Sequence, residues 1–393
     1  MLLDLGIPRG NVIAVSGYEF ESGETEDVYA QQWGATNGNQ FILWLSEEGG
    51  NKTFVFGDKD SLHQDTTITL TFNKYIPTIV EANDEDSLEK GLVEVQEGGT
   101  VKIDNNINLT KHLVINKPIT LDLGANNIEA GAQAVLIQGD TTVTGTGTIN
   151  SSHQQSAVQV ENAKLTLAGG NVNSTTLYGI NLVGDSELEI NGGNVHSKDS
   201  CISSNNKDSE HSIITIEDGE LTSDTDATIY MPAPCTINVN GGTLNGGINA
   251  RMGTINVNGG TINSISSGND NIKDYYSFQG NVWLGDAIAC MAGTYTSPFE
   301  GQSNKLEINI TDGTINGLCN GCSAVTIYNL GKVAQDISVT IGENATLTVV
   351  DDTQPLYKKV AAKDIVPAEA DDYAEYTAVE NTVVENIAEK FIA

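Results

Sequence analysis

The chain has 393 residues, with 52 acidic and 19 basic side chains and a formal net charge of −33. Nucleic acids and anionic membrane surfaces attract clustered basic side chains, so this balance argues against both as partners. No window approaches 18 unbroken apolar residues, and we therefore expect no membrane insertion. The N-terminus, MLLDLGIPRGNVIAV, has no basic region before its apolar run, which predicts no signal peptide and synthesis in a reducing cytoplasm.

Residues 1–80 predict a small β domain, expected to serve for attachment, with strands in NVIAVSGYEF, NQFILWLSEEGGNKTFVFGD and TTITLTFNKYI. The middle segment predicts a hairpin that turns at Glu47–Asn51. Residues 81–96 predict a linker and a helix, because acidic residues and Ser87 precede an apolar helical pattern. Such a helix would cap the open end of the structure that follows.

Residues 97–350 contain an internal repeat. The phrase INVNGGTLN begins at Ile237, and INVNGGTIN begins at Ile255. Related phrases recur at steps of about 18–26 residues, centred on glycines that include Gly147, Gly170, Gly193 and Gly219. Within each unit, apolar residues alternate with polar ones as in short strands. One unit cannot bury its apolar face alone, so the pattern predicts an all-β fold, a right-handed parallel β-helix of stacked coils.

An asparagine recurs at one position of the repeat, directly after an apolar residue. The members of this row are Asn150, Asn173, Asn245, Asn263 and Asn316, with His196 and Thr222 in the same position of other units. Stacked amides pass hydrogen bonds from one coil to the next, which predicts a structural ladder. A ligand-binding row is the alternative.

A long insertion separates Gly260 from Gly313 and concentrates aromatic side chains. These are Tyr275, Tyr276, Phe278, Trp283, Tyr295 and Phe299. Aromatic side chains stack on sugar rings and anchor protein partners, so we expect this loop to contact a glycan or a neighbouring subunit. The alternative is a loop that packs on its own solenoid.

Motifs for catalysis or metal binding are weak in this sequence. A nucleophile elbow and a phosphate-binding Walker loop are both absent. Asp224 and Asp226 are close enough in sequence to share a cation, but two carboxylates are a weak signal. Cys319 and Cys322, in CNGC, have metal-like or redox-like spacing, yet zinc needs two more ligands. Five cysteines, an odd number, do not indicate a disulfide framework. We expect no metal, no cofactor and no catalytic residues.

Residues 351–393 predict a polar connector and an amphipathic C-terminal helix. Val379, Val383, Ile387 and Phe391 recur at helical spacing, with Glu and Asn between them. The helix would cover the last coil or dock onto a partner.

The coils of residues 90–350, with their I-x-V-x-G-G-T-I-N phrase, resemble the pectate-lyase-like right-handed β-helix superfamily. The layout is similar to phage tailspikes and head fibres, and to repeat-bearing surface proteins of gut bacteria. In phage fibres an N-terminal domain attaches to the virion and three chains commonly associate. The resemblance thus implies a homotrimer on the virion surface, with capsid or tail proteins and possible host-cell glycans as partners.

The resemblance also bears on catalysis. Pectate-lyase-like enzymes use a basic residue beside acidic calcium ligands, and Arg251 is the one arginine of the repeat region, without carboxylates at coil spacing. Polygalacturonase-like signatures are absent. We therefore expect a non-catalytic structural protein: a head fibre, capsid decoration protein or tailspike. The alternatives are a bacterial surface adhesin or carbohydrate-binding β-helix, and a polysaccharide-degrading tailspike.

Overall fold

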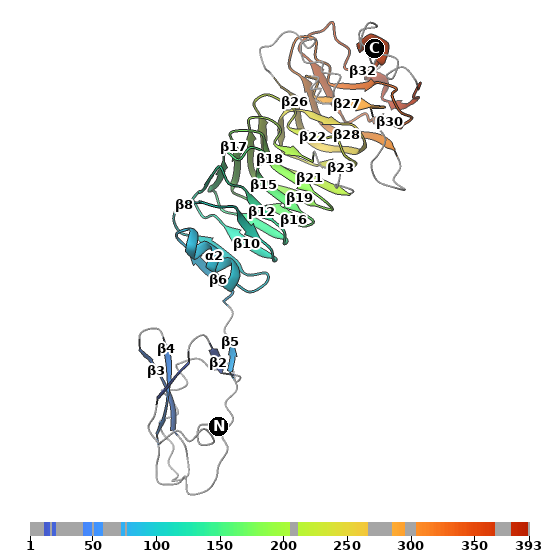
Figure 1. The fold of residues 1–393 in the computed structure, drawn as a ribbon. Helices are drawn as coiled ribbons and strands as arrows, with labels where there is room; N and C mark the ends of the chain where they lie inside the picture. The colour runs from blue at the N-terminus through green and yellow to red at the C-terminus, as the bar shows by residue number, and fades with distance from the viewer. Residues whose placement is uncertain are drawn as a thin grey trace. The chain divides into compact units, whose positions relative to one another are not determined.

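The structure is a computed structural model, and it divides into two compact units, Met1–Pro77 and Thr78–Ala393 (Figure 1). In the first unit it describes five strands. In the second it describes residues 78–204, 211–265, 285–294, 304–365 and 379–391. The prediction of an all-β chain with long parallel sheets is confirmed, and the sheets are consistent with a β-helix solenoid.

The N-terminal unit contains two small antiparallel sheets. One has the strand order β1 (Val12–Val15), β4 (Asn51–Gly57) and β3 (Ile42–Glu48), and the other pairs β2 (Tyr18–Phe20) with β5 (Phe72–Lys74). Glu48 pairs with Asn51, so the β3–β4 hairpin turns within the segment where its sequence predicts a turn.

The second unit begins with strand β6 (Ile79–Ala82) and helix α2 (Glu85–Glu94). A capping box starts the helix: the backbone N–H of Ser87 donates to Asp84 Oδ1 at 2.8 Å, and the Ser87 hydroxyl accepts from the backbone N–H of Asp84 at 3.0 Å. Leu88 and Leu92 are buried in the solenoid core. Helix α2 therefore covers apolar side chains at the N-terminal end of the stack.

Each coil contributes a first and a second strand to a large sheet and a third strand to a small sheet. Among the described residues the large sheet has 18 strands and the small one 10. The separate first strands are β6, β7 (Thr100–Ile103), β10 (Ile119–Asp122), β13 (Thr141–Thr144), β16 (Lys164–Leu167), β23 (Cys235–Val239), β30 (Asp336–Ile341) and β33 (Val383–Ile387). The separate second strands are β8 (Ile107–Asn108), β11 (Ile128–Gly131), β14 (Thr148–Ser151), β17 (Asn171–Ser174), β24 (Thr243–Gly246) and β31 (Thr346–Val349).

In four coils the first and second strands run on without a break, as β19 (Glu187–Ser197), β21 (Ser212–Ser223), β26 (Gly253–Ser264) and β28 (Lys305–Gly317). The third strands are β9 (Leu113–Ile115), β12 (Val135–Ile137), β15 (Ser156–Glu161), β18 (Tyr178–Val183), β20 (Ile202–Ser203), β22 (Ile229–Met231), β25 (Ile248–Ala250), β27 (Ile288–Ala292), β29 (Val325–Asn329) and β32 (Tyr357–Ala361). The short helices α3 (Ala362–Ile365) and η2 (Glu389–Phe391) follow near the C-terminus.

The core is built from apolar columns that run through successive coils. One column consists of Val172, Val195, Leu221, Leu244, Ile262 and Ile315, each paired in register with the next. All six are 0–1% exposed and belong to one continuous cluster. The copied phrases of the sequence therefore supply equivalent side chains to a shared interior.

Glycine makes the bend between the first and second strands possible. Gly193 has φ +79°, a left-handed value that other residues rarely adopt. A Cβ atom at this position would lie 2.0 Å from the carbonyl oxygen of Gly170 in the previous coil. The bend therefore needs glycine both for its backbone angle and for the close approach of the coil below.

The predicted C-terminal helix is wrong over residues 383–387, which form strand β33. This strand pairs in parallel with β30, with Ile337 opposite Val383 and Ile341 opposite Ile387. A spacing of four residues places side chains on one face of a helix, but four is also even and places them on one face of a strand. The available sheet edge at β30 favours the strand.

In the last coil, polar side chains occupy positions that hold apolar side chains in the preceding coil. Tyr357 and Lys359 of β32 pair in register with Val325 and Ile327, and Glu385 of β33 with Val339. The Tyr357 hydroxyl donates to Glu385 Oε1 at 2.7 Å, and Lys359 Nζ lies 2.9 Å from Glu385 Oε2. These contacts join β32 to β33, so the apolar columns end beneath a hydrogen-bonded polar group.

Candidate functional site on the outer face of the large sheet

The second strands of the large sheet present a continuous polar row, which we call the Asn row. Its members pair in register from coil to coil in the order Glu129, Asn150, Asn173, His196, Thr222, Asn245, Asn263, Asn316 and Thr348. Side chains alternate between the two faces of a strand, so the buried apolar column places this row on the outer face.

The N-terminal part of the Asn row is a chain of hydrogen bonds with one direction. Asn150 Nδ2 donates to Glu129 Oε1 at 3.0 Å, and Asn173 Nδ2 donates to Asn150 Oδ1 at 3.0 Å. An ionised carboxylate only accepts hydrogen bonds, so Glu129 sets the orientation of both amides. The oxygen of Asn173 consequently faces the next coil.

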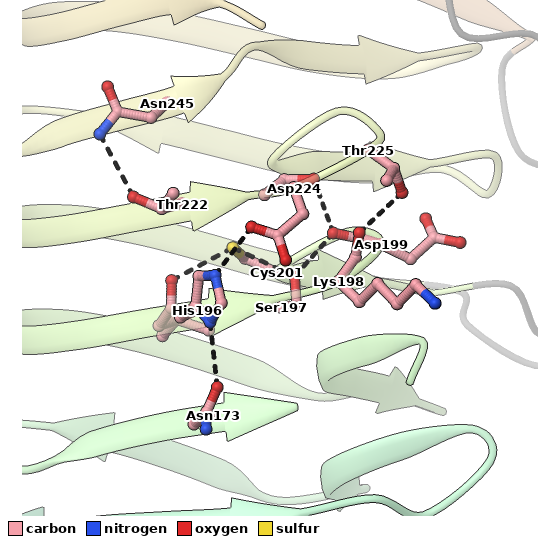
Figure 2. Close-up of polar contacts among 12 residues, drawn as sticks. Asn173, His196, Ser197, Lys198, Asp199, Cys201, Thr222, Asp224, Thr225 and Asn245 are labelled. Atoms are coloured by element: carbon pink, nitrogen blue, oxygen red, sulfur yellow. Dashed lines mark hydrogen bonds and ion pairs between the residues drawn. The ribbon is translucent and has the colours of Figure 1, made fainter. Parts of the chain in front are cut away.

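His196 occupies the next position, and Figure 2 shows its ring between two acceptors. Its Nδ1 lies 3.0 Å from Asn173 Oδ1, and its Nε2 lies 2.9 Å from Asp224 Oδ1. The imidazolium form has an N–H on each ring nitrogen and satisfies both acceptors. His196 therefore ends the N-terminal ladder and ties it to the following coil through Asp224.

The ladder resumes beyond Thr222. Asn245 Nδ2 donates to the Thr222 hydroxyl at 3.2 Å, Asn263 Nδ2 to Asn245 Oδ1 at 2.9 Å, and Asn316 Nδ2 to Asn263 Oδ1 at 2.8 Å. The Thr348 hydroxyl then donates to Asn316 Oδ1 at 2.6 Å. The five asparagines named from sequence all take part in this coil-to-coil hydrogen bonding.

An acidic corner lies beside His196, where the chain turns towards the small sheet. The Ser197 hydroxyl donates to the backbone carbonyl of Asp199 at 2.7 Å (Figure 2). The Ser223 hydroxyl donates to the same carbonyl, also at 2.7 Å. Asp226 is largely buried, and this burial, together with the neighbouring Asp199 carboxyl, raises the pKa of Asp226 to about 7. The raised pKa lets Asp226 keep its proton closer to neutral pH than an exposed aspartate does.

Asp224 and Asp226, considered from sequence as a shared cation site, have different partners in the structure. Asp224 contacts His196, whereas Asp226 interacts with Asp199. In the described part of the chain, no cluster of three or more histidine, cysteine or acidic residues is arranged to hold a metal ion.

Sequence reasoning missed two further amide ladders on the first strands. In one, Asn309 donates to Asn256 at 3.1 Å, and Asn256 donates to Asn238 at 2.9 Å. In the other, Asn258 donates to Asn240 at 3.0 Å. The signal was present in the repeated INVN segment, where asparagines alternate with buried residues.

A second polar group lies on the small sheet, around buried charges. Arg251 is buried, and its Nη2 donates to the Tyr230 hydroxyl at 3.1 Å. Asp286 accepts from the Tyr328 hydroxyl at 2.7 Å and from the backbone N–H of Ser323 at 2.6 Å. Burial raises the pKa of Asp286, and the charge of Lys358 opposes this shift. The spacing of these residues in the sequence did not predict this polar group.

The remaining sequence candidates divide into two groups. Tyr275, Tyr276, Phe278, Trp283, Tyr295 and Phe299 lie outside the described residues. Cys319 and Cys322, whose sequence did not indicate a disulfide framework, are joined as a disulfide pair.

Comparison of the chain with protein-family models, with curated proteins and with solved structures finds no match. No helix among the described residues has the length and apolar character that crossing a bilayer requires.

Proposed function

We propose that this chain is a non-catalytic structural protein of a phage virion surface: a head fibre, a capsid decoration protein or a tailspike. Its shaft in this proposal is a right-handed parallel β-helix, because parallel strands joined through a crossover in one sheet almost always follow that hand. The proposal extends to a homotrimer, which the resemblance of the coils to phage fibre shafts implies.

The observation that carries the proposal is the unbroken stacking of coils. First strands pair in parallel from β6 to β33 without interruption, a stack about 50 Å long at ~4.8 Å per step. Backbone ladders, one apolar core and the Asn row connect successive coils. Such a stack resists bending and is suited to hold surfaces at a fixed distance. The separate Met1–Pro77 unit suits an attachment piece.

The polar outer face supports contact with host glycans. An asparagine amide has two N–H groups and an oxygen with two lone pairs. A ladder bond on each side uses one N–H and one lone pair, so Asn263 retains an N–H and a lone pair for sugar hydroxyls. Asn245 donates to Glu220 Oε1 as well as to Thr222, and it retains a lone pair only. Because these amides repeat at coil spacing, they suit the binding of a polymeric glycan, whose sugar units also repeat.

The test is proteomics of particles purified by density gradient. We expect the chain on intact virions in a copy number divisible by three, and on their surface by antibody labelling. Recovery from infected cells but not from purified particles would refute the virion assignment. Recovery from the envelope of uninfected bacteria would favour the adhesin alternative.

The acidic corner favours a polysaccharide-degrading tailspike as the second candidate. Asp226, with its raised pKa, can donate a proton beside the exposed His196–Asp224 pair. Release of reducing sugar from host glycan by the wild type, lost in Asp226→Asn but retained in Asn240→Ala, would establish this activity in place of the non-catalytic role.

A further inference from the structure

The turn that follows β28 brings two cysteines together. The backbone N–H of Cys322 donates to the carbonyl of Cys319 at 3.1 Å, and Gly321 has φ +78°, as the third residue of a type II turn requires. The Cα atoms of Cys319 and Cys322 are 5.2 Å apart, within the range that a disulfide spans. Local backbone geometry thus pairs the sulfurs without help from distant segments.

The two sulfurs differ in accessibility. Cys319 is only partly buried, whereas Cys322 is 0% exposed. Both sulfurs contact the carbonyl oxygen of Gly285, Cys319 Sγ at 3.6 Å and Cys322 Sγ at 2.9 Å. A partly exposed sulfur beside a buried partner matches the division between an attacking and a resolving cysteine.

The three other cysteines provide a contrast within the same chain. Cys201, Cys235 and Cys290 are buried in the core, and burial raises the pKa of each thiol to about 12. Thiolates are the reactive form, so these thiols are inert in the folded protein. Reactivity is therefore confined to the turn.

We propose that Cys319 and Cys322 form a redox site that exchanges with low-molecular-weight disulfides such as oxidised glutathione. The Cys319 thiolate attacks one glutathione sulfur, forms a mixed disulfide and releases one glutathione thiolate, which takes up the proton that Cys319 lost. Cys322, after losing its proton to water, attacks Cys319 Sγ, and the second glutathione leaves and is protonated. Two protein thiols are oxidised to one disulfide while one glutathione disulfide is reduced to two thiols.

The redox state changes contacts at the junction of neighbouring coils. In the disulfide, Cys322 Sγ lies 2.9 Å from the Gly285 carbonyl oxygen without a proton to donate, and reduction would supply an S–H that can donate to that oxygen. Gly285 precedes Asp286, which accepts from the backbone N–H of Ser323, directly after Cys322. Oxidation closes the turn and removes one bond to the segment that leads into β27. This inference is independent of the proposed virion role.

The experiment titrates the full-length wild-type chain with graded ratios of oxidised to reduced glutathione. Free thiols are blocked after unfolding in acid, and peptides are assigned by mass spectrometry. We expect Cys319 and Cys322 to lose their free thiols together, with loss of two hydrogens from their peptide, while Cys201, Cys235 and Cys290 stay free. Two free thiols in the turn at the most oxidising ratio would overturn the proposal.

Two variants test the order of attack. Cys322→Ser leaves Cys319 without a resolving partner and should stop at the glutathione adduct. Cys319→Ser leaves a buried thiol that should take up glutathione at least tenfold more slowly than Cys319 does in the first variant. Equal adduct formation in the two variants would refute the assigned roles. Cys290→Ser, which removes a core thiol, is the matched control and should titrate like the wild type.

Discussion

Replacing Gly193 by alanine tests how closely the coils approach at the bend of the large sheet. The new Cβ would lie 2.0 Å from the Gly170 carbonyl oxygen, and φ at this position is +79°. The left-handed backbone alone costs about 1–2 kcal/mol. Relieving the contact moves one coil by about 1 Å and weakens about two interstrand hydrogen bonds, each worth about 1 kcal/mol. Together these effects predict a loss of about 3–4 kcal/mol.

Gly98 is the matched control, because it has φ +76° but no atom within 4 Å of the place that a Cβ would occupy. Gly98→Ala should therefore cost only the backbone contribution of about 1–2 kcal/mol. Denaturant unfolding of both variants measures the difference, and hydrogen exchange of the β19 peptide locates it. Equal losses for the two variants, within about 0.5 kcal/mol, would refute close stacking at the bend.

Three further substitutions test the ladder, the acidic corner and the C-terminal end. Asn263→Ala breaks hydrogen bonds on both sides and should lower the unfolding free energy by about 1–2 kcal/mol. Asn263→Thr should recover part of this loss. Equal melting curves for Asn263→Ala and the wild type would contradict the ladder. The pKa of Asp226 is raised from 3.8 to about 7, so the unfolding free energy of the wild type should fall on the order of 2–4 kcal/mol as pH rises from 4 to 7. Asp226→Asn should flatten this fall and be the more stable form at pH 8. An unchanged pH profile in the variant would refute the role of Asp226. Lys359→Val combined with Glu385→Val extends the apolar columns to the last coil. The double variant should associate end to end, as measured by light scattering at high salt. A monodisperse double variant of wild-type size would show that the polar end does not block stacking.

Much of the solenoid could be predicted from local patterns in the sequence. The copied phrases at Ile237 and Ile255 predicted equivalent positions in adjacent coils, and they pair residue by residue. Val195 and Leu244 stand at equivalent positions of the repeat, and both belong to the one core cluster that stacked units require. This succeeded because each coil contacts mainly its neighbours, so the repeat in sequence is also the repeat in space.

The polar groups were less predictable where their partners come from different elements. Asn173 could be assigned to a row because its partner lies one repeat away. The Arg251–Tyr230 contact joins two buried side chains whose positions follow no repeat, and Glu385 meets Lys359 only because β33 completes the last coil. Such contacts depend on where strands end, and periodicity carries no information about that.

The sequence alone determined the period, the alternation of buried and outward residues, the glycine bends and the asparagine positions, because all of these are local properties repeated at coil spacing. Only the tertiary structure decided that residues 383–387 form a strand and that the apolar columns end in a Tyr357–Lys359–Glu385 group. Their pattern suits a helix and a strand equally. The unpaired edge of β30 selects the strand, since backbone groups beside a buried core need hydrogen-bond partners.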